Sequence, residues 1–505
     1  MLKMINQKNT MFYLFLFVNA ICWTLIQLFR NAVGDDALEA ISWGSLADFG
    51  TNKHPPLSGW LAGGFYNILG QHDFAVYILG QICILLGSIF IYKLAKFFIE
   101  DEKALCASMI LSSSYYYTFI IFKDSFNCNV LSMWLWPMII YYFYKSLKMN
   151  KITDWILFGI SSGLGVLAKY QIAFLFLAMF IYLIICERKQ FKQKGLYIAF
   201  VTGLLIILPH IIWLYKTDFF SFIYITGRTN IGAHNTPTFL VRFGRVFFPI
   251  KFLADQILSL LPCIILYILL AIQAKNIKYK NENGKTEDKI FLLILGIAPI
   301  LIQGMIPLLT GTRVMGVWGS IMVSMAGIML FYFFPIEFKQ NTYKFFIKSI
   351  YVIMSLWLIS MFIFSQLQTK LAISYPYQTI MKDFDSMWNS RTNNAPLKYV
   401  GGYLSYVFQF NVYNKNHPTV ILETFNHENP WIDPEDVIKS GAIILVKKPE
   451  QLEQKSRELI TMLPENYRII PEKYEFTITN KWKTKSKNYV FYYVIIPPLN
   501  MIQYW

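Results

Sequence analysis

Residues 11–28 read MFYLFLFVNAICWTLIQL, and after Phe29 the chain continues with Arg30-Asn31-Ala32-Val33-Gly34-Asp35-Asp36. The apolar run is long enough to cross a bilayer as a helix. The acidic pair then lies at the water boundary, on the side opposite the amino terminus. Carboxylates are costly close to hydrocarbon and tend to occur there where chemistry or ion handling needs them. The alternative is a solvated loop that carries two Asp residues, and position alone does not decide between the two.

The composition is that of an integral membrane protein. Of the 505 residues, 55% are hydrophobic and 15% are charged, whereas soluble proteins carry roughly 25% charged residues. The formal net charge is +16. Because Lys and Arg cluster in short loops between apolar runs, we expect this charge to set topology and not to bind nucleic acid. All six cysteines fall inside apolar segments, which predicts neither a disulfide framework nor a zinc site of paired cysteines.

A scan for apolar runs predicts about eleven membrane spans. Their ranges are 11–30, 74–98, 104–122, 128–145, 154–168, 171–186, 195–215, 250–274, 289–309, 314–335 and 345–365. With the amino terminus inside, the inner segments hold 20 basic residues and the outer segments before residue 366 hold 10. The positive-inside rule supports this orientation. An odd number of spans then places the acidic pair and everything after residue 365 on the outer face.

The predicted fold is an α-helical polytopic membrane protein of the first 365 residues, followed by an extracytoplasmic α/β domain over 366–505. Within the first outer loop, 31–73, the apolar spacing of 57–69 fits a short helix that lies along the membrane interface. A second outer segment, 216–249, is predicted to be largely loop. In the carboxyl-terminal domain we predict the following elements: strands at Leu397–Val400, Ile443–Val446 and Tyr489–Ile496, and helices at 376–389 and 450–461.

Four short motifs follow one another along the chain, all on the predicted outer face. They are Gly34-Asp35-Asp36-Ala37, Asn52-Lys53-His54-Pro55-Pro56-Leu57, Phe122-Lys123-Asp124-Ser125 and Leu167-Ala168-Lys169-Tyr170. Together they resemble motifs of the polyprenyl-phosphate-sugar-dependent glycosyltransferases of the GT-C fold, in particular the group of protein mannosyltransferases and lipid A aminoarabinose transferases. The carboxyl-terminal part is similar only through Asn429-Pro430-Trp431-Ile432-Asp433-Pro434.

Two residues depart from the family pattern. Lys53 stands where the aminoarabinose enzymes carry Glu, which puts a metal site of their kind in doubt. Asp36 stands where Glu is common in protein mannosyltransferases, which keeps the negative charge on a side chain that is shorter by one methylene group.

The resemblance implies a donor in which a sugar is joined through phosphate to a polyprenyl chain. Attack on the anomeric carbon expels the polyprenyl phosphate, which needs charge stabilisation more than protonation. We expect the donor phosphate and sugar to be bound by Lys53, His54, Lys169, Tyr170 and Arg313. A Lys or Arg at the end of a span has an alternative interpretation. Its side chain then snorkels, placing its charge at the membrane interface without binding the donor.

Asp35, Asp36 and Asp124 are the candidate catalytic residues. Asp35 is the candidate general base for a hydroxyl acceptor, and one carboxylate acting in a single displacement predicts inversion at the anomeric carbon. If the acceptor is a phosphate, no base is required and Asp35 orients groups or binds a cation. Asp124 orients the acceptor or shares a divalent cation with Asp35 or Asp36. No cofactor is certain: such a cation would be Mg²⁺ or Mn²⁺, or Zn²⁺ if His54 takes part with Asp35 and Asp124.

The sequence therefore predicts transfer of a sugar, with an amino sugar among the options, from an undecaprenyl-phosphate-type donor to a lipid A-type glycolipid. The expected place is the periplasmic face of a bacterial inner membrane. Protein O-mannosylation is the second interpretation. A polytopic transporter is the alternative from another class, and a non-catalytic binding scaffold is a further one. Transporters usually place ionisable groups near the midplane, whereas here only Asp255 falls near a membrane position.

Overall fold

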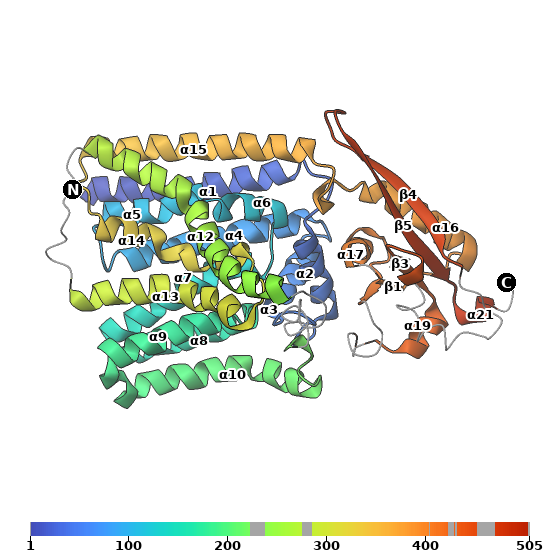
Figure 1. Cartoon of the computed structure of the whole chain (residues 1–505), viewed down its shortest axis with the longest axis horizontal. Coiled ribbons are helices and arrows are strands. Elements are labelled where there is room, and N and C mark those ends of the chain that lie inside the picture. Colours follow the sequence, from blue (N-terminus) through green and yellow to red (C-terminus); the bar gives the residue numbers. More distant parts are fainter. Residues whose placement is uncertain are drawn as a thin grey trace. The chain divides into compact units, whose positions relative to one another are not determined.

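The computed structural model describes residues 2–222, 238–274, 285–402, 404–422, 429, 432–451 and 470–502 (Figure 1). The chain forms two compact units. The first consists of Met1–Gln27, Phe49–Ser58 and Tyr77–Met361, and the second of Leu28–Asp48, Gly59–Val76 and Phe362–Trp505. The second unit thus combines two segments of the predicted first outer loop with the carboxyl-terminal region. The boundary at residue 365 stays a prediction.

The first unit is helical. Its elements are α1 (Leu2–Gln27), α4 (Phe74–Ala95), α5 (Asp101–Met109), η1 (Ile110–Ser113), η2 (Tyr116–Ile120), α6 (Ile121–Asp124), α7 (Cys128–Met149), α8 (Ile152–Ala168), α9 (Ile172–Cys186), η3 (Arg188–Lys192), α10 (Lys194–Lys216), α12 (Thr238–Ala274), α13 (Thr286–Thr310), η4 (Gly316–Gly319), η5 (Met322–Met325), α14 (Ala326–Phe333) and α15 (Gln340–Leu367). The first residues of α4, up to Val76, and the last residues of α15, from Phe362, belong to the second unit.

The chain is a multi-pass membrane protein. Among the described residues, 6 helices are long and apolar enough to cross a membrane, or up to 7 if the bent pair Asp101–Ser113 and Tyr116–Asp124 is one span. The six are Lys8–Gln27, Phe74–Ala95, Lys194–Lys216, Phe243–Ala274, Thr286–Thr310 and Asn341–Leu367. These described helices are fewer than the about eleven spans that apolar runs predict.

The difference has a physical cause, since an apolar run suits a short buried helix as well as a span. The runs at 154–168 and 171–186 form α8 and α9, of 17 and 15 residues, which lie at or below the lower end of the range of about 17–25 residues for a span. The run at 314–335 is divided among η4, η5 and α14. The run at 128–145 lies in α7, whose 22 residues give it the length of a span but which is not among the helices apolar enough.

Small residues let the short helices pack closely. A Cβ added at Gly159 of α8 would lie 2.4 Å from the carbonyl oxygen of Ala199 in α10. A Cβ at Gly327 of α14 would lie 2.0 Å from the carbonyl oxygen of Ala107 in α5. Glycine allows such backbone approach between helices in a membrane, where dispersion contacts carry most of the association.

In the second unit, α2 (Asp35–Leu46) and α3 (Leu57–Ile68) touch through glycines. A Cβ at Gly44 would lie 2.3 Å from the carbonyl oxygen of Gly59 and 2.5 Å from the Cα of Gly63. Helix α3 confirms the helix predicted in 57–69. Helix α2 was not predicted, although an acidic first turn, here Asp35 and Asp36, is favourable at the positive end of a helix dipole.

Hydrogen bonds tie these two loop segments to the carboxyl-terminal region within the same unit. In α17 (Leu404–Tyr413), the Asn411 side chain accepts a bond from Ser42 Oγ of α2 at 2.8 Å. Tyr66 Oη of α3 donates to the Val412 carbonyl at 2.6 Å. Tyr413 Oη accepts from the Val33 backbone N–H at 3.0 Å. Because α17 lies beside β1 and β2, this links α2 and α3 to the sheet.

The described strands form a mixed five-stranded sheet of order β2-β1-β3-β5-β4. Strand β1 is parallel to β2 and β3, and β5 is antiparallel to β3 and β4. The elements of this region are η6 (Ala372–Ser374), α16 (Tyr377–Thr392), β1 (Tyr399–Gly402), β2 (Thr419–Ile421), α19 (Pro434–Ser440), β3 (Ala442–Val446), β4 (Glu472–Thr479), β5 (Ser486–Ile496) and α21 (Leu499–Ile502).

Strands β1, β3 and β5 and helix α16 confirm the elements predicted at those places, while β2, β4, α17 and α19 were not predicted. The helix predicted at 450–461 lies outside the described residues apart from its first two positions. Much of 216–249, expected to be loop, and Pro430 and Trp431 of the loosely matching motif also lie outside them. The part that is described from Thr238 onward is helix α12, which corrects the loop reading there.

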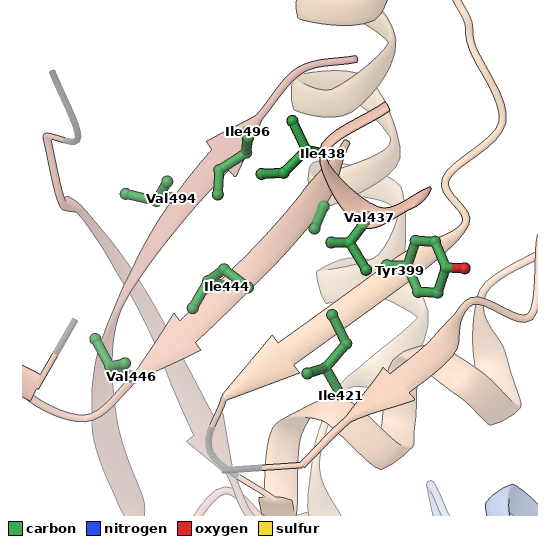
Figure 2. Packing of buried hydrophobic residues seen from close by; sticks show 9 residues of the cluster. Tyr399, Ile421, Val437, Ile438, Ile444, Val446, Val494 and Ile496 are labelled. Atoms are coloured by element: carbon green, nitrogen blue, oxygen red, sulfur yellow. The ribbon is translucent and has the colours of Figure 1, made fainter. Parts of the chain in front are cut away.

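The core of the carboxyl-terminal sheet is formed by branched aliphatic side chains (Figure 2). Ile444, Val494 and Ile496 from the strands pack with Val437 and Ile438 of α19. Their β-branched shape suits the pleated surface. Helix α19 starts with a capping residue, as the Asp433 side chain accepts the Glu435 N–H at 3.0 Å, and Pro434 fits the first helical position.

We predict that Gly44→Ala destabilises the protein by about 1–3 kcal/mol, because the new methyl group forces apart two backbones that cannot yield like a side chain. The matched control is Gly64→Ala on α3, where an added Cβ meets nothing within 4 Å. Thermal unfolding of the full chain in detergent should show a lower midpoint for the first variant only. Equal midpoints for the two variants would show that the α2–α3 contact is not close.

An ion pair joins α16 to the sheet. The Arg391 guanidinium pairs with both oxygens of Glu472 on β4, and Tyr493 Oη of β5 donates to Glu472 Oε2 at 2.8 Å. The Arg391 guanidinium holds the pKa of the Glu472 carboxyl below its usual value, helped by Tyr493. A lowered pKa means that the stabilisation is present above the unfolded pKa, about 4.3, and is lost as the pH falls through the folded pKa.

We therefore predict that Glu472→Gln is less stable than the original chain at pH 7 and that the difference shrinks as the pH drops below about 4. The pair is partly exposed, so the effect at pH 7 is on the order of 1 kcal/mol or less. Melting curves of both proteins at several pH values test this. A gap that stays constant with pH would contradict it.

Candidate functional site

Six of the eight predicted site residues lie in the first unit: Lys53, His54, Asp124, Lys169, Tyr170 and Arg313. Asp35 and Asp36 lie in the second unit, where both are exposed in the first turn of α2. Within the first unit, hydrogen bonds bring together several of the segments that carry these residues.

Lys53 and His54 lie in a turn that Thr51 organises. Thr51 Oγ1 accepts the backbone N–H groups of Lys53 at 3.2 Å and His54 at 2.9 Å, and it donates to the His54 carbonyl at 2.8 Å. Pro55 and Pro56 follow; they lack an N–H and restrict the backbone of the turn. The turn is thus held in one conformation, with both Lys53 and His54 half-buried.

Three consecutive residues at the corner between α8 and α9 each contact a different part of the unit. Lys169 is only 8% exposed, and its Nζ donates to Asn129 Oδ1 in the first turn of α7. Tyr170 Oη lies 3.0 Å from His210 Nε2 of α10. Gln171 Nε2 donates to the Trp318 carbonyl at 2.7 Å. We call Lys169, Tyr170 and Gln171 the α8–α9 corner.

His210 extends this connection to the turn of Lys53 and His54. Its Nδ1 lies 2.6 Å from the carbonyl oxygen of Phe49, and a carbonyl can only accept. Nδ1 therefore carries the proton and Nε2 accepts from Tyr170, which assigns the tautomer. The ring of Trp213, also on α10, packs against Gly50. A Cβ added at Gly50 would lie 2.2 Å from a carbon of this ring. Tyr170 and the turn are thus held by the same helix.

Asp124 ends α6 and is 5% exposed. Its carboxylate pairs with Lys123 Nζ at 3.0 Å. The next residue, Ser125, has a positive φ of 62°, and Asn127 then caps α7 by accepting the Val130 N–H at 2.9 Å. Asn129, the partner of Lys169, lies in the first turn after this cap. Asp124 and Lys169 are therefore attached to the same short segment, between the end of α6 and the start of α7.

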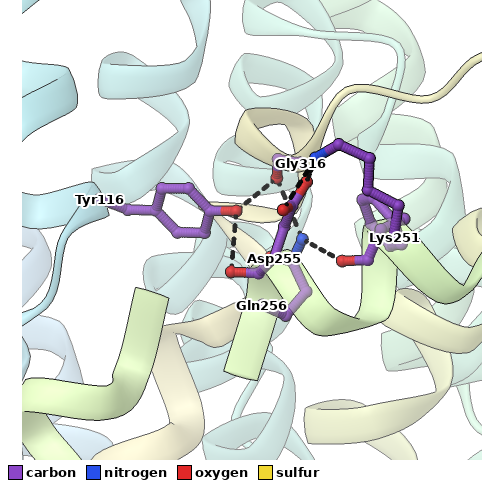
Figure 3. A network of polar contacts seen from close by, with 6 residues as sticks. Tyr116, Lys251, Asp255, Gln256 and Gly316 are labelled. Carbon is purple, nitrogen blue, oxygen red and sulfur yellow. Dashed lines mark hydrogen bonds and ion pairs between the residues drawn. The ribbon is translucent and has the colours of Figure 1, made fainter. Parts of the chain in front are cut away.

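Arg313 is exposed on the segment between α13 and η4. That segment is fixed by a network on α12 and η2 (Figure 3). Tyr116 Oη donates to the Gly316 carbonyl at 2.8 Å, and Gln256 Nε2 donates to the same carbonyl at 3.0 Å. Beside them, Lys251 Nζ pairs with Asp255 at 2.7 Å. Asp255, the acid predicted near a membrane position, thus has a cationic partner.

The sequence did not single out Asn129, Gln171 or Tyr116 as parts of a site. A sequence signal existed only for Gln171, which directly follows the motif residues Lys169 and Tyr170. His210 was noted for its side of the membrane, but nothing in the sequence pairs it with Tyr170, 40 positions away. Among the described residues, no group of three or more His, Cys, Asp or Glu side chains could hold a metal ion. A divalent cation stays a prediction.

Residues 53–213 match the family described as dolichyl-phosphate-mannose-protein mannosyltransferase. The predicted family resemblance is confirmed. The matched region contains Lys53, His54, Asp124, Lys169 and Tyr170, and it ends beside His210.

A curated relative is the lipopolysaccharide core galacturonosyltransferase RgtA of Rhizobium johnstonii. It is 20% identical over 200 residues, which cover 39% of this chain and 39% of that protein. The chain thus matches about two fifths of the relative's length. Among solved structures, the archaeal oligosaccharyltransferase AglB from Archaeoglobus fulgidus, in complex with an inhibitory peptide and a dolichol-phosphate, is similar with a TM-score of 0.40 and 11% sequence identity. That alignment covers 86% of this chain and 69% of the other.

We predict that His210→Ala loosens the turn of Lys53 and His54, because it removes the Nδ1 donor to the Phe49 carbonyl and the Nε2 partner of Tyr170 Oη. The expected loss of folding stability is about 1–3 kcal/mol, as for removal of one partner from buried hydrogen bonds. Hydrogen–deuterium exchange of a peptide covering 49–54 should become faster. The matched control is His72→Ala, an exposed histidine. Unchanged exchange in the His210 variant would show that the hydrogen bonds of His210 with Tyr170 and the Phe49 carbonyl do not hold the turn.

Proposed function

We propose that this protein is a membrane glycosyltransferase that moves a sugar from a polyprenyl-phosphate donor to a glycolipid of the lipid A type. The observation that carries the proposal is that residues 53–213 match a family of lipid-phosphate-sugar-dependent mannosyltransferases and hold most of the candidate residues. The hydrogen bonds of the α8–α9 corner support it, because they join the segments of Asp124, Lys169 and the turn of Lys53 and His54.

In the proposed reaction the acceptor oxygen attacks the anomeric carbon of the donor. The bond from that carbon to the phosphate oxygen breaks, and the electron pair leaves with the polyprenyl phosphate. Lys53, Lys169 and Arg313 would balance the negative charge of the leaving group. Lys169 is well suited to this, since its ammonium group is nearly buried and its Nζ donates to Asn129 Oδ1 at the start of α7, where a cation acts more strongly than in water.

Asp35 is the proposed general base when the acceptor is a hydroxyl, and it takes the proton that the hydroxyl loses on attack. A single displacement of this kind inverts the anomeric centre. With a phosphate acceptor the nucleophile is already ionised, and Asp35 and Asp36 would orient groups instead. Asp124, whose carboxylate is nearly buried beside Lys123, would orient the acceptor.

Two different observations bear on the acceptor. The galacturonosyltransferase relative is named for the lipopolysaccharide core, which favours a lipid A-type glycolipid. The family description names protein as acceptor, which favours protein O-glycosylation as the second candidate. The proposed location is a bacterial inner membrane. The positive-inside count supports an active site on its periplasmic side.

The first test is mass spectrometry of lipid A from cells with and without this protein. A sugar mass should be present only with the protein. Asp35→Asn should reduce the modified fraction by a factor of about 100 or more if Asp35 acts as the base. A sugar mass lost from membrane glycopeptides instead would favour the second candidate.

The matched control is Asp218→Asn, an exposed acid of the first unit. Both variants should insert into the membrane at the same level as the original chain. If Asp35→Asn does not affect transfer to either acceptor, Asp35 is not the general base. If cells with and without the protein show no difference in glycan mass on any acceptor, the protein is not the proposed glycosyltransferase.

A further inference from the structure

The hairpin of β4 and β5 ends in a basic and aromatic tip, which we define as residues 480–487. It reads Asn480-Lys481-Trp482-Lys483-Thr484-Lys485-Ser486-Lys487 and contains four lysines and no acid. Every lysine of the tip is exposed, and Trp482 is 51% exposed. Trp482 thus presents an apolar surface among cationic side chains. The same combination is typical of segments that rest in the headgroup layer of a membrane.

The tip has a defined conformation. The Asn480 side chain accepts the Thr484 N–H at 2.8 Å and donates to Thr484 Oγ1 at 2.8 Å. The Asn480 carbonyl accepts the Lys483 N–H at 2.9 Å, and Lys483 takes a positive φ of 57°. The lysines of the tip are thus presented on a closed turn.

The tip is attached at the ends of two candidate membrane spans. The Lys481 N–H donates to the carbonyl of Gln366 at 3.0 Å, in the last turn of α15. Lys481 Nζ donates to the carbonyl of Phe29, just after α1. The rings of Phe29 and Phe362 pack edge to face at 5.3 Å. Because spans end where the hydrocarbon gives way to headgroups, these contacts hold the tip at that boundary.

A small pocket lies where the tip meets these ends. Its lining includes the cationic residues Arg30 and Lys481 and the amide residues Asn31 and Asn480. Among the described residues that line it, none is acidic. Cationic donors together with amide N–H donors are the chemistry that binds a phosphate monoanion.

We propose that the hairpin tip and this pocket bind anionic phospholipid headgroups of the leaflet in which α1 and α15 end. The lipid phosphate contacts Arg30 and Lys481, the remaining lysines contact neighbouring headgroups, and Trp482 lies among them at the interface. This site shares no residue with the proposed donor site of Lys53, His54, Lys169, Tyr170 and Arg313. Its function is to hold the carboxyl-terminal region against the membrane surface.

The test places a photo-crosslinking benzophenone side chain at Trp482 of the full-length protein. The protein is reconstituted in nanodiscs of phosphatidylcholine with about one third phosphatidylglycerol, without any lipid-linked sugar, and the lipid adducts are identified by mass spectrometry. We expect phosphatidylglycerol adducts well above its share of the bilayer. Lys483→Ala, Lys485→Ala and Lys487→Ala together should reduce this enrichment by a factor of about five or more, since lysines close to an anionic surface attract its headgroups.

The matched control removes three exposed lysines from the same unit, through Lys382→Ala, Lys415→Ala and Lys439→Ala. It changes the net charge equally and should leave the enrichment unchanged. Adducts in proportion to bilayer composition, or enrichment abolished equally by inorganic phosphate in solution, would overturn the proposal. So would adducts that form only after polyprenyl phosphate is added, because the site would then serve the donor. If the original protein shows the phosphatidylglycerol enrichment but transfers no sugar, the proposed function is contradicted and the lipid-binding proposal is not.

Discussion

The first unit depends on the pairing of polar groups at the α8–α9 corner. Inside a membrane protein, a polar side chain without a partner costs several kcal/mol. Lys169, Tyr170 and Gln171 meet this constraint by contacting Asn129, His210 and the Trp318 carbonyl, respectively. Because each partner belongs to a different helix or loop, satisfying the three side chains also fixes the positions of α7, α10 and the segment after α13. The same contacts join the motif-bearing segments that make up the candidate site.

The second unit follows a different constraint, which is close backbone contact. Gly44, Gly59 and Gly63 leave no room for a Cβ between α2 and α3, and α17 links this pair to the sheet through Asn411 and Tyr413. Asp35 and Asp36 begin α2, so the conformation of the acidic motif is set by helices that belong to the carboxyl-terminal unit. Changes far along the chain, in α17 for example, should therefore affect the acidic pair.

The sequence predicted those elements whose local pattern agrees with their final environment. Strands β1, β3 and β5 are apolar runs, and α3 has helical spacing, so pattern and structure coincide. Strand β2 has only three residues, too few to give a pattern. Strand β4 alternates Tyr474, Phe476 and Ile478 with polar residues, which is itself a strand pattern. The motif Gly34-Asp35-Asp36 is typical of a loop and does not by itself predict helix α2, whose buried face is formed by Ala37, Leu38 and Ile41.

Within the candidate site, the motif residues were found by resemblance, and their partners were not. The Tyr170–His210 bond and the Lys169–Asn129 bond connect positions 40 residues apart, and no local pattern encodes such a pairing. In the described part of the chain, fewer helices than predicted have both the length and the hydropathy of a span, because an apolar run alone does not distinguish a span from a short helix buried among others. Both differences depend on information that only the packing contains.

The most direct measurement uses the purified full-length protein with a synthetic polyprenyl-phosphate sugar and a lipid A acceptor, and it follows the release of free polyprenyl phosphate over time. The account predicts release that requires the acceptor and that falls by a factor of about 100 or more in Lys169→Met, as for loss of a group that stabilises a developing charge. No release by the original protein with either a lipid A or a peptide acceptor, or equal release by the two proteins, would contradict it.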